Sequence, residues 1–316
     1  MNVEGTKVRM YQPGDEEGII RLFNSIFPRE MTLEEWRWKY LGRGNTKVYS
    51  SVVVDQEQGI VAHYGGVPHR MTYLGKEVYG LAIGDVMVHP RFRHFKTFKK
   101  MAELVPDEAA RDGFILGYGF PSERALKLPE KLGLYEKVED IVEANKDIAS
   151  KNNLSRFFYK FFPLDYNDER IEKLWDECKM EIGLGVIRDR AYFKWRYRDH
   201  PFMKYELWGL RHRIRSSLVG LAVLKKEPER ILLMDFLVRK IHLNSLISKI
   251  ENYTLASCLK RLTVWIPPYL EEAFQLLGYS TAPAGTCIPR TTHEKGLTKK
   301  EIEGRFFYTF GDTDFQ

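Results

Sequence analysis

The sequence predicts a mixed α/β protein made of two related domains in tandem, and three observations support this prediction. First, the chain has 316 residues, which is long for one compact domain and suggests two. Second, strand-like and helix-like hydrophobic patterns alternate along it, as is typical of folds with a mixed sheet. Third, short motifs of the first half recur in the second half, as expected of a duplicated fold.

The first half begins with one strand, two helices and three further strands. Alternating apolar residues predict a strand over residues 8–12. Helical spacing follows in the apolar positions Ile19, Leu22, Phe23, Ile26 and Phe27. A second helix is expected after Thr32, because Glu35 completes a capping-box pattern with it. The three strand patterns that come next cover residues 47–54, 59–73 and 78–88.

The first half ends with two helices that alternate with two strands. A basic, aromatic loop leads into a helix predicted from Phe98 to about Arg111. A strand over 114–120, a helix over 122–133 and a strand over 134–144 follow it. A meander followed by crossover connections predicts a mixed α+β sheet.

A polar and aromatic segment separates the two halves. Residues 147–166 interrupt the pattern and predict a linker between an N-terminal domain, 1–146, and a C-terminal domain, 167–316. Within the linker, the run "FFYKFF" at 157–162 is too apolar to lie free in solvent. We therefore expect it to pack across the domain junction.

Four motifs of the first half recur beyond the linker. They are Trp38-Lys39-Tyr40 with Trp195-Arg196-Tyr197, Val61-Ala62 with Val219-Gly220, "GDVMV" at 84–88 with "MDFLV" at 234–238, and Gly133 with Gly278. Chance similarity of short aromatic motifs is the alternative explanation. Duplication of one fold explains all four together and also predicts that Asp235 corresponds to Asp85.

Composition places the chain among ordinary globular proteins. It is 44% hydrophobic and 29% charged, and it has neither a signal-peptide pattern at its start nor an apolar run long enough for a membrane span. We expect a cytoplasmic protein. Its three cysteines lack paired spacing, which predicts buried or partly buried free thiols rather than disulfides or a metal site. The net charge of +6 suits a nucleotide-like cofactor and tRNA equally well.

Two segments carry a family resemblance. The segments "GDVMVHPRFR" at 84–93 and "GFPSERALKLPEKLGLYEKV" at 119–138, in this order of elements, resemble the GNAT superfamily of acyl-CoA-dependent N-acyltransferases. The resemblance covers about residues 7–145, and the second half looks like a more divergent copy. It implies two tandem GNAT-like domains. Such tandem folds occur in peptidoglycan-bridge aminoacyltransferases, N-myristoyltransferases and multi-acetylating aminoglycoside enzymes.

The resemblance also implies where acetyl-CoA or another acyl-CoA would bind. The strand before the basic loop would pair with the pantetheine arm, and the loop motif R/Q-x-x-G-x-G/A would hold the pyrophosphate. Carried over by position, the cofactor-binding residues are Met87, Val88, Arg93, His94, Phe95, Lys96, Thr97, Phe98 and Ser122. Lys96 and Phe98 replace the family's small residues. A lysine at a helix start could add a phosphate contact, and a phenylalanine there could point into the core.

Acyl transfer to an amine needs a base for the ammonium and an acid for the departing thiolate. The resemblance implies Asp85 as the base, directly or through water. The family's usual tyrosine acid is replaced by Pro129, so Tyr118 is the predicted proton donor. His63 could titrate near neutrality, and the C-terminal carboxylate of Gln316 is a further candidate because some tandem relatives use theirs as a base. No metal is implied.

Three functions follow from the sequence. The first is an N-acyltransferase, most simply an N-acetyltransferase, whose small-molecule or peptide amine acceptor binds between the two domains. The second is a tRNA-dependent aminoacyltransferase, which needs no glycine-rich loop and would use the basic surface. The third is a GNAT-like binding protein that has lost its chemistry. The acceptor, the acyl chain and the oligomeric state are left open.

Overall fold

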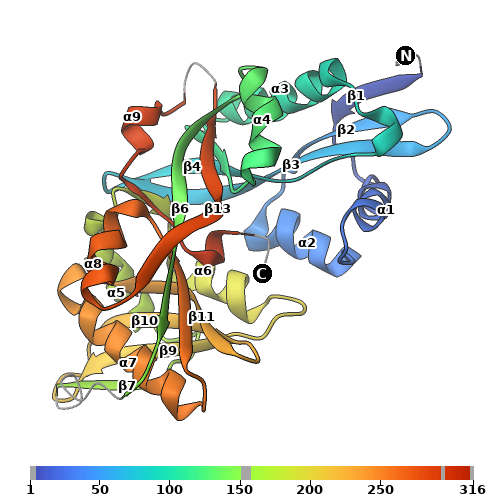
Figure 1. The fold of residues 1–316 in the computed structure, drawn as a ribbon. Coiled ribbons are helices and arrows are strands. Elements are labelled where there is room, and N and C mark those ends of the chain that lie inside the picture. Colours follow the sequence, from blue (N-terminus) through green and yellow to red (C-terminus); the bar gives the residue numbers. More distant parts are fainter. Residues whose placement is uncertain (1–4, 151–157, 293–295, 314–316) are drawn as a thin grey trace. The chain divides into compact units, whose positions relative to one another are not determined.

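The structure, a computed structural model, describes residues 5–150, 158–292 and 296–313. The chain forms two compact units (Figure 1). Unit 1 consists of Met1–Arg70, Val78–Glu139 and Thr286–Glu301, and unit 2 of Met71–Glu77, Asp140–Gly285 and Ile302–Gln316. Each unit therefore includes segments from both halves of the sequence. The predicted cut into 1–146 and 167–316 stays a proposal about the two domains.

Unit 1 is built on a mixed sheet. Its strands are β1 (Thr6–Met10), β2 (Tyr49–Asp55), β3 (Gly59–Tyr73), β4 (Lys76–Val88) and β5 (Leu116–Gly119), adjacent in that order. β1, β2 and β3 pair antiparallel, whereas β4 and β5 pair parallel. β13 (Ser280–Thr291) pairs antiparallel with β5 through its last residues. This is the predicted meander and crossover.

Helices cover both faces of this sheet. Figure 1 shows α1 (Glu16–Ile26) and α2 (Leu33–Leu41) on one side of β1–β3 and α3 (Phe95–Arg111) on the other. Two core clusters match these sides, one around α1 and α2 and one around α3. α2 begins as predicted, because the Thr32 side chain accepts a hydrogen bond from the Glu35 N–H. α4 (Glu123–Lys131) completes the unit.

Unit 2 repeats this plan with a second set of strands. Its strands are β6 (Tyr135–Asp147), β12 (Arg261–Ile266), β11 (Arg230–Val238), β10 (Leu218–Lys226), β9 (Glu206–His212) and β7 (Tyr159–Pro163), adjacent in that order. β11 and β12 pair parallel, like β4 and β5. β8 (Leu184–Val186) pairs with β14 (Phe306–Phe307). The helices are α5 (Arg170–Cys178), α6 (Arg190–Phe193), α7 (Leu243–Ala256) and α8 (Glu271–Leu276), while α9 (Lys299–Ile302) lies at the boundary of the two units.

The described part of the predicted linker includes a strand. Tyr159–Pro163 forms strand β7 and pairs antiparallel with β9. Within unit 2, the ring of Phe161 stacks on Trp208 at 5.0 Å. The described part of the apolar run is only partly covered: Phe161 packs within its own sheet, whereas Phe158 is 69% exposed, contrary to the expectation that the run avoids solvent. Residues 151–157 lie outside the described part.

Each unit contains an equivalent hydrogen bond from a tyrosine to an aspartate, and this repetition supports duplication. The Tyr40 hydroxyl donates to Asp85 Oδ2 at 2.7 Å in unit 1, and the Tyr197 hydroxyl donates to Asp235 Oδ2 at 2.8 Å in unit 2. Both tyrosines and both aspartates belong to the recurring motifs. The same residue types meet across similar sequence separations, 45 and 38 residues. The motifs therefore recur in the structure as well as in the sequence.

The cysteines match the prediction except in one case. All three are free thiols; Cys178 and Cys287 are buried, but Cys258 is exposed. Cys258 follows the end of α7 in a turn with φ of 61°, where its side chain meets solvent.

Candidate active site

Pairing between strand β4 and its parallel neighbour β5 ends where β5 itself ends, at Gly119. The last pair in register is Ile83 with Gly119. A Cβ on residue 119 would lie 2.9 Å from the Ile83 carbonyl oxygen, so only glycine permits this approach. β4 runs on to Val88, and these last residues lie beyond the pairing with β5. Met87 and Val88, the predicted pantetheine strand, are among them.

Asp85 lies in this part of β4, beyond the pairing with β5, and is the centre of a buried polar cluster. Its φ of 48° is left-handed, which an aspartate tolerates better than most residues. Its carboxylate accepts hydrogen bonds from Lys39 Nζ at 2.8 Å and from the Tyr40 hydroxyl. The Lys39 and Asp85 side chains are only 4% and 8% exposed. α2 therefore supplies both partners of the carboxylate.

The cluster keeps Asp85 ionised. Burial by itself would raise the pKa of Asp85, but the charge and hydrogen bond of Lys39, together with the hydrogen bond from Tyr40, hold that pKa below its usual value. His63 Nδ1 lies 2.8 Å from the Asp85 carbonyl oxygen, and burial lowers the pKa of this imidazole. His63 Nε2 is buried without a partner among the described residues. Neutral His63 thus faces an ionised Asp85.

Tyr118, the predicted proton donor, belongs to a second buried pair. It lies on β5 opposite Ala82 of β4, and its hydroxyl is 2.7 Å from His69 Nδ1. Both side chains are buried. The structure therefore brings Asp85 together with Lys39, Tyr40 and His63, and Tyr118 together with His69.

The basic loop after β4 carries charge that nothing nearby neutralises. Arg91, Arg93 and Lys96 are exposed, and among the described residues none of the three forms an ion pair. α3 begins at Phe95, three residues earlier than predicted, with His94 as its N-cap and no side-chain cap. Cations at a helix N-terminus are repelled by the positive end of the helix dipole. An anion bound there is attracted by the cations and by the dipole.

Polar atoms of the same loop also lack partners. His89 Nδ1 and His94 Nδ1 are buried without a hydrogen-bond partner in the described parts of the chain. The first three N–H groups of α3 have no intrahelical acceptor, whereas the Phe98 N–H already donates to the His94 carbonyl oxygen at 3.0 Å. Phosphate oxygens would satisfy these donors, so the residues present fit the pyrophosphate of acyl-CoA.

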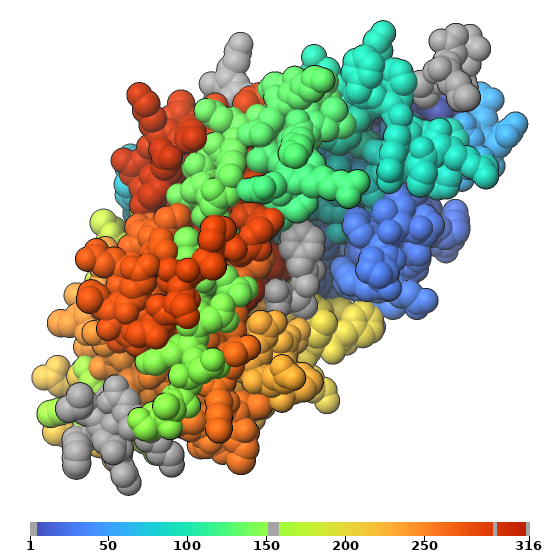
Figure 2. All heavy atoms as spheres, viewed as in Figure 1, coloured from blue at the N-terminus to red at the C-terminus, as the bar shows by residue number. Residues whose placement is uncertain are grey.

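The two departures from the family motif have separate structural explanations. Phe98 packs against the core cluster around α3, as expected if it points inward. Lys96 is exposed in the first turn of α3, and the side chains of this helix lie at the surface of unit 1 in Figure 2 (teal).

Ser122, predicted at the cofactor, accepts a hydrogen bond from the Ala125 N–H and caps α4. Pro129 is buried within α4.

Several residues of the site were missed by the sequence reasoning. In the sequence, Lys39 and Tyr40 stand out only as part of a recurring motif, and His69 belongs to no motif. The recurrence was a usable signal for Tyr40, because its counterpart Tyr197 binds the counterpart of Asp85. Nothing in the sequence linked His69 to Tyr118, 49 residues away.

The first half of the chain and the overall fold each resemble known N-acyltransferases. Residues 7–136 match the family model of the acetyltransferase (GNAT) domain. This match lies in the first half, where the sequence resemblance is found, and covers less than half of the chain. No curated protein matches the sequence.

Solved structures support the fold over nearly the whole chain. A probable N-acyltransferase from Enterococcus faecalis V583 covers 90% of this chain and 72% of its own, with a TM-score of 0.69 and 12% identity. A GCN5-related N-acetyltransferase from Anabaena variabilis has the same coverage and TM-score at 15% identity. The Saccharomyces cerevisiae N-myristoyltransferase with bound myristoyl-CoA covers 92% of this chain and 83% of its own, with a TM-score of 0.62 and 10% identity. The predicted tandem GNAT-like fold is confirmed.

The described residues lack a candidate membrane helix and a candidate metal site. None of their helices is long and apolar enough to cross a membrane. Nor do they contain a group of three or more His, Cys, Asp or Glu that could hold a metal ion.

Proposed function

We propose that the protein is an acyl-CoA-dependent N-acyltransferase, most simply an N-acetyltransferase, that acylates an amine of a small molecule or peptide. The observation that carries the proposal is the end of the β4–β5 pairing at Ile83 and Gly119. Beyond this pair, the backbone of β4 is not paired with β5 and leads to the basic start of α3. The resemblance places acyl-CoA at this position. The GNAT match of residues 7–136 supports the same assignment. The cytoplasmic location stays a prediction.

Each part of the site has a role in this proposal. Acyl-CoA supplies an activated thioester carbonyl. The N–H groups of the first turn of α3, with Arg93 and Lys96, bind its phosphates. Beyond the last β5 pair, the backbone of Met87 and Val88 binds the pantetheine arm.

The proton transfers are assigned to the two buried pairs. Tyr118 holds a proton at its hydroxyl for the departing thiolate, and His69 Nδ1, 2.7 Å away, fixes the orientation of that hydroxyl. Asp85 is ionised, which is the state a base needs, but its low pKa makes it a weak proton acceptor. It therefore acts best by polarising a water that takes the ammonium proton.

Acyl-CoA binding is the first test. Acetyl-CoA at a hundred times its dissociation constant should stabilise the protein by about 2.7 kcal/mol, measured by thermal denaturation alongside longer acyl-CoAs. Lys96→Glu should weaken this stabilisation, because it reverses one charge at the helix start. Lys7→Glu, an exposed lysine on edge strand β1, is the matched control and should leave it unchanged. Absence of a shift with every acyl-CoA at millimolar concentration would remove the proposal.

The unneutralised cations of the loop also suit tRNA phosphates, which keeps the aminoacyltransferase as the second candidate. Arg91, Arg93 and Lys96 carry this alternative. It predicts tRNA retention that falls steeply with salt. Retention of tRNA without any acyl-CoA shift would favour it over the first proposal.

The catalytic assignment has its own test. Asp85→Asn and Tyr118→Phe should each lower kcat by roughly 10²- to 10⁴-fold, the usual range for losing acid or base assistance. Circular dichroism and thermal melting of each variant separate this loss from unfolding, since both side chains are buried. If both folded variants keep full activity, the assignment is wrong, while the fold and acyl-CoA binding stand unaffected.

A further inference from the structure

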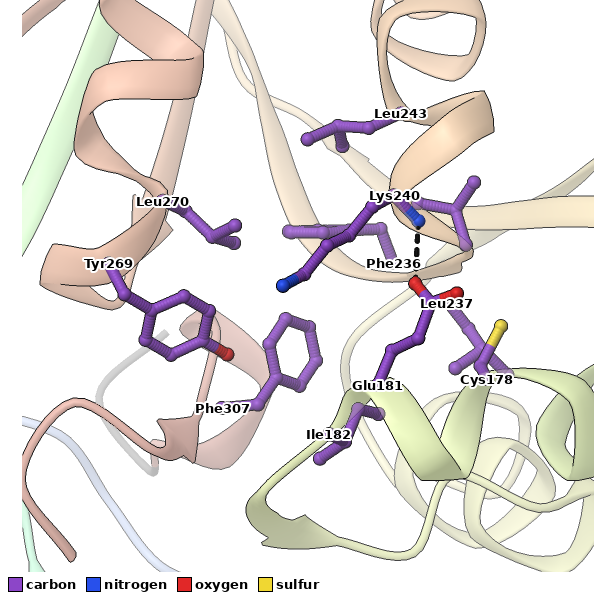
Figure 3. Close-up of a pocket in the computed structure, with 11 residues that line it drawn as sticks. Cys178, Glu181, Ile182, Phe236, Leu237, Lys240, Leu243, Tyr269, Leu270 and Phe307 are labelled. Atoms are coloured by element: carbon purple, nitrogen blue, oxygen red, sulfur yellow. Dashed lines mark hydrogen bonds between the residues drawn. The ribbon is translucent and has the colours of Figure 1, made fainter.

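Unit 2 contains a pocket that lies entirely within it, at the end of β11 and the start of α7. Its volume is about 40 Å³. Figure 3 shows side chains from β11, α5, the 3-10 turns and β14 converging on it. Its walls are mostly apolar, and they include Ile182, Phe236, Leu243, Leu270 and Phe307. The polar groups are those of Glu181, Lys240 and Tyr269, together with the Cys178 thiol.

Duplication relates this pocket to the acyl-CoA site of unit 1. β11 continues after Asp235 as β4 continues after Asp85, and a 3-10 turn and a long helix follow in both units. In unit 2, however, the turn already has an anion. Glu181 accepts a hydrogen bond from the Lys240 N–H at 2.8 Å and forms an ion pair with Arg239 at 3.2 Å. The internal carboxylate takes the place that a phosphate would need.

One cation of the turn remains without a partner. The Lys240 ammonium extends into the pocket between Phe236, Tyr269 and Leu270, away from Glu181 (Figure 3). It forms no ion pair with any residue that the structure describes. A charge beside apolar walls is most favourable when an opposite charge joins it. The pocket thus offers one positive charge and an apolar surface.

The surroundings of the pocket match an amphipathic ligand. Met180 and Ile241, which adjoin lining residues in sequence, are 72% and 75% exposed, and Tyr269 is 37% exposed. Of these three, Tyr269 lines the pocket, and a partly exposed aromatic side chain at a concave site is typical of ligand-binding surfaces. Burial raises the pKa of the Cys178 thiol to about 12, so this thiol is a neutral part of the wall and not a nucleophile.

We propose that this pocket binds a monocarboxylate with a short branched or linear aliphatic tail. The carboxylate pairs with Lys240 Nζ, and the tail lies against Phe236, Leu243 and Phe307. One water needs about 10–15 Å³ of such space. The pocket, at 40 Å³, therefore holds roughly three waters or a tail of three to four carbons. Butyrate and isovalerate are the matching probes. The proposal does not depend on acyl-CoA binding in unit 1.

The test uses the full chain and ligand-observed NMR titration with isovalerate. Isovalerate should bind, and isoamylamine, which has the same branched tail but the opposite charge, should not. Lys240→Gln should weaken isovalerate binding about tenfold, as expected when a charged hydrogen bond is lost. Glu181→Gln should strengthen it, because a nearby negative charge is removed while the acceptor for the Lys240 N–H stays.

Matched controls make the result decisive. Lys173→Gln on α5, an exposed lysine of the same unit, should bind isovalerate like the unmodified protein. Lys240 is itself exposed, so its variant is expected to fold, which circular dichroism verifies. The proposal is overturned if isovalerate does not bind, if the amine binds equally well, or if Lys240→Gln leaves the affinity unchanged.

Discussion

Arg188→Met is expected to destabilise unit 2 by about 3–5 kcal/mol. Arg188 is fully buried, and its guanidinium donates to Asp235 Oδ1 at 2.8 Å and to Asp312 Oδ2 at 2.5 Å. Without it, two buried carboxylates face each other with no counter-charge. Urea denaturation of the two proteins measures the difference. Arg190→Met is the control, because its contact with Glu172 is partly exposed and long at 3.8 Å, so it should cost less than about 1 kcal/mol.

The pH dependence of this deficit distinguishes lost charge from lost packing. Burial already raises the pKa of Asp312, and the charge of Asp235 adds to that rise while Arg188 opposes it. Removing Arg188 raises the folded-state pKa further above the unfolded value. The folded variant then binds more protons, so its stability falls as the pH rises through the unfolded pKa near 4. The deficit should therefore shrink in acid; a deficit independent of pH would contradict the electrostatic explanation.

Lys39→Met is the second large effect and acts on unit 1. It should also cost about 3–5 kcal/mol, because the buried Asp85 carboxylate then keeps only a neutral donor, the Tyr40 hydroxyl, in the described part of the chain. Denaturation monitored by tryptophan fluorescence reports the loss. Lys47→Met provides the comparison, since Lys47 is 44% exposed in its pairs with Glu108 and Asp112. That variant should lose less than about 1 kcal/mol.

Acid should shrink this deficit too, although the pKa of Asp85 is lowered in the unmodified protein whereas that of Asp312 is raised. In the unmodified protein the pKa of Asp85 is lowered, so its contribution to stability is present above the unfolded pKa near 3.9 and disappears as the pH falls through the folded value. Lys39→Met removes that contribution. The variant should therefore be less sensitive to acid between pH 5 and pH 3 than the unmodified protein, as measured by denaturation at each pH. Equal acid sensitivity would mean that Lys39 does not stabilise the ionised carboxylate.

Much of the secondary structure could be predicted because local patterns decide it. The capping box at Thr32, the amphipathic α1 and the long β3 and β4 follow from side-chain spacing and short-range hydrogen bonds. The start of α3 was misplaced by three residues, since the apolar pattern marks Phe98 as inward-facing but carries no signal for the exposed first turn at Phe95.

The site was only partly predictable because its contacts join residues far apart in the chain. The resemblance drew attention to Asp85 and Tyr118. Their partners Lys39 and His69 come from elements 46 and 49 residues away, and no local pattern connects such pairs. The Tyr–Asp bond that both units share was present in the sequence as two recurring motifs, but pairing one motif with the other requires the fold.

The sequence alone indicated the GNAT-like fold, the recurring motifs and the basic loop after β4, because these depend on residue type and order. Tertiary structure alone decided which segments make each unit, since short stretches such as Met71–Glu77 and Thr286–Glu301 join the unit they pack against, not the half they come from. It also decided the charge state of Asp85 and the internal Glu181 carboxylate in unit 2. Burial and long-range pairing set both, and neither is written in local sequence.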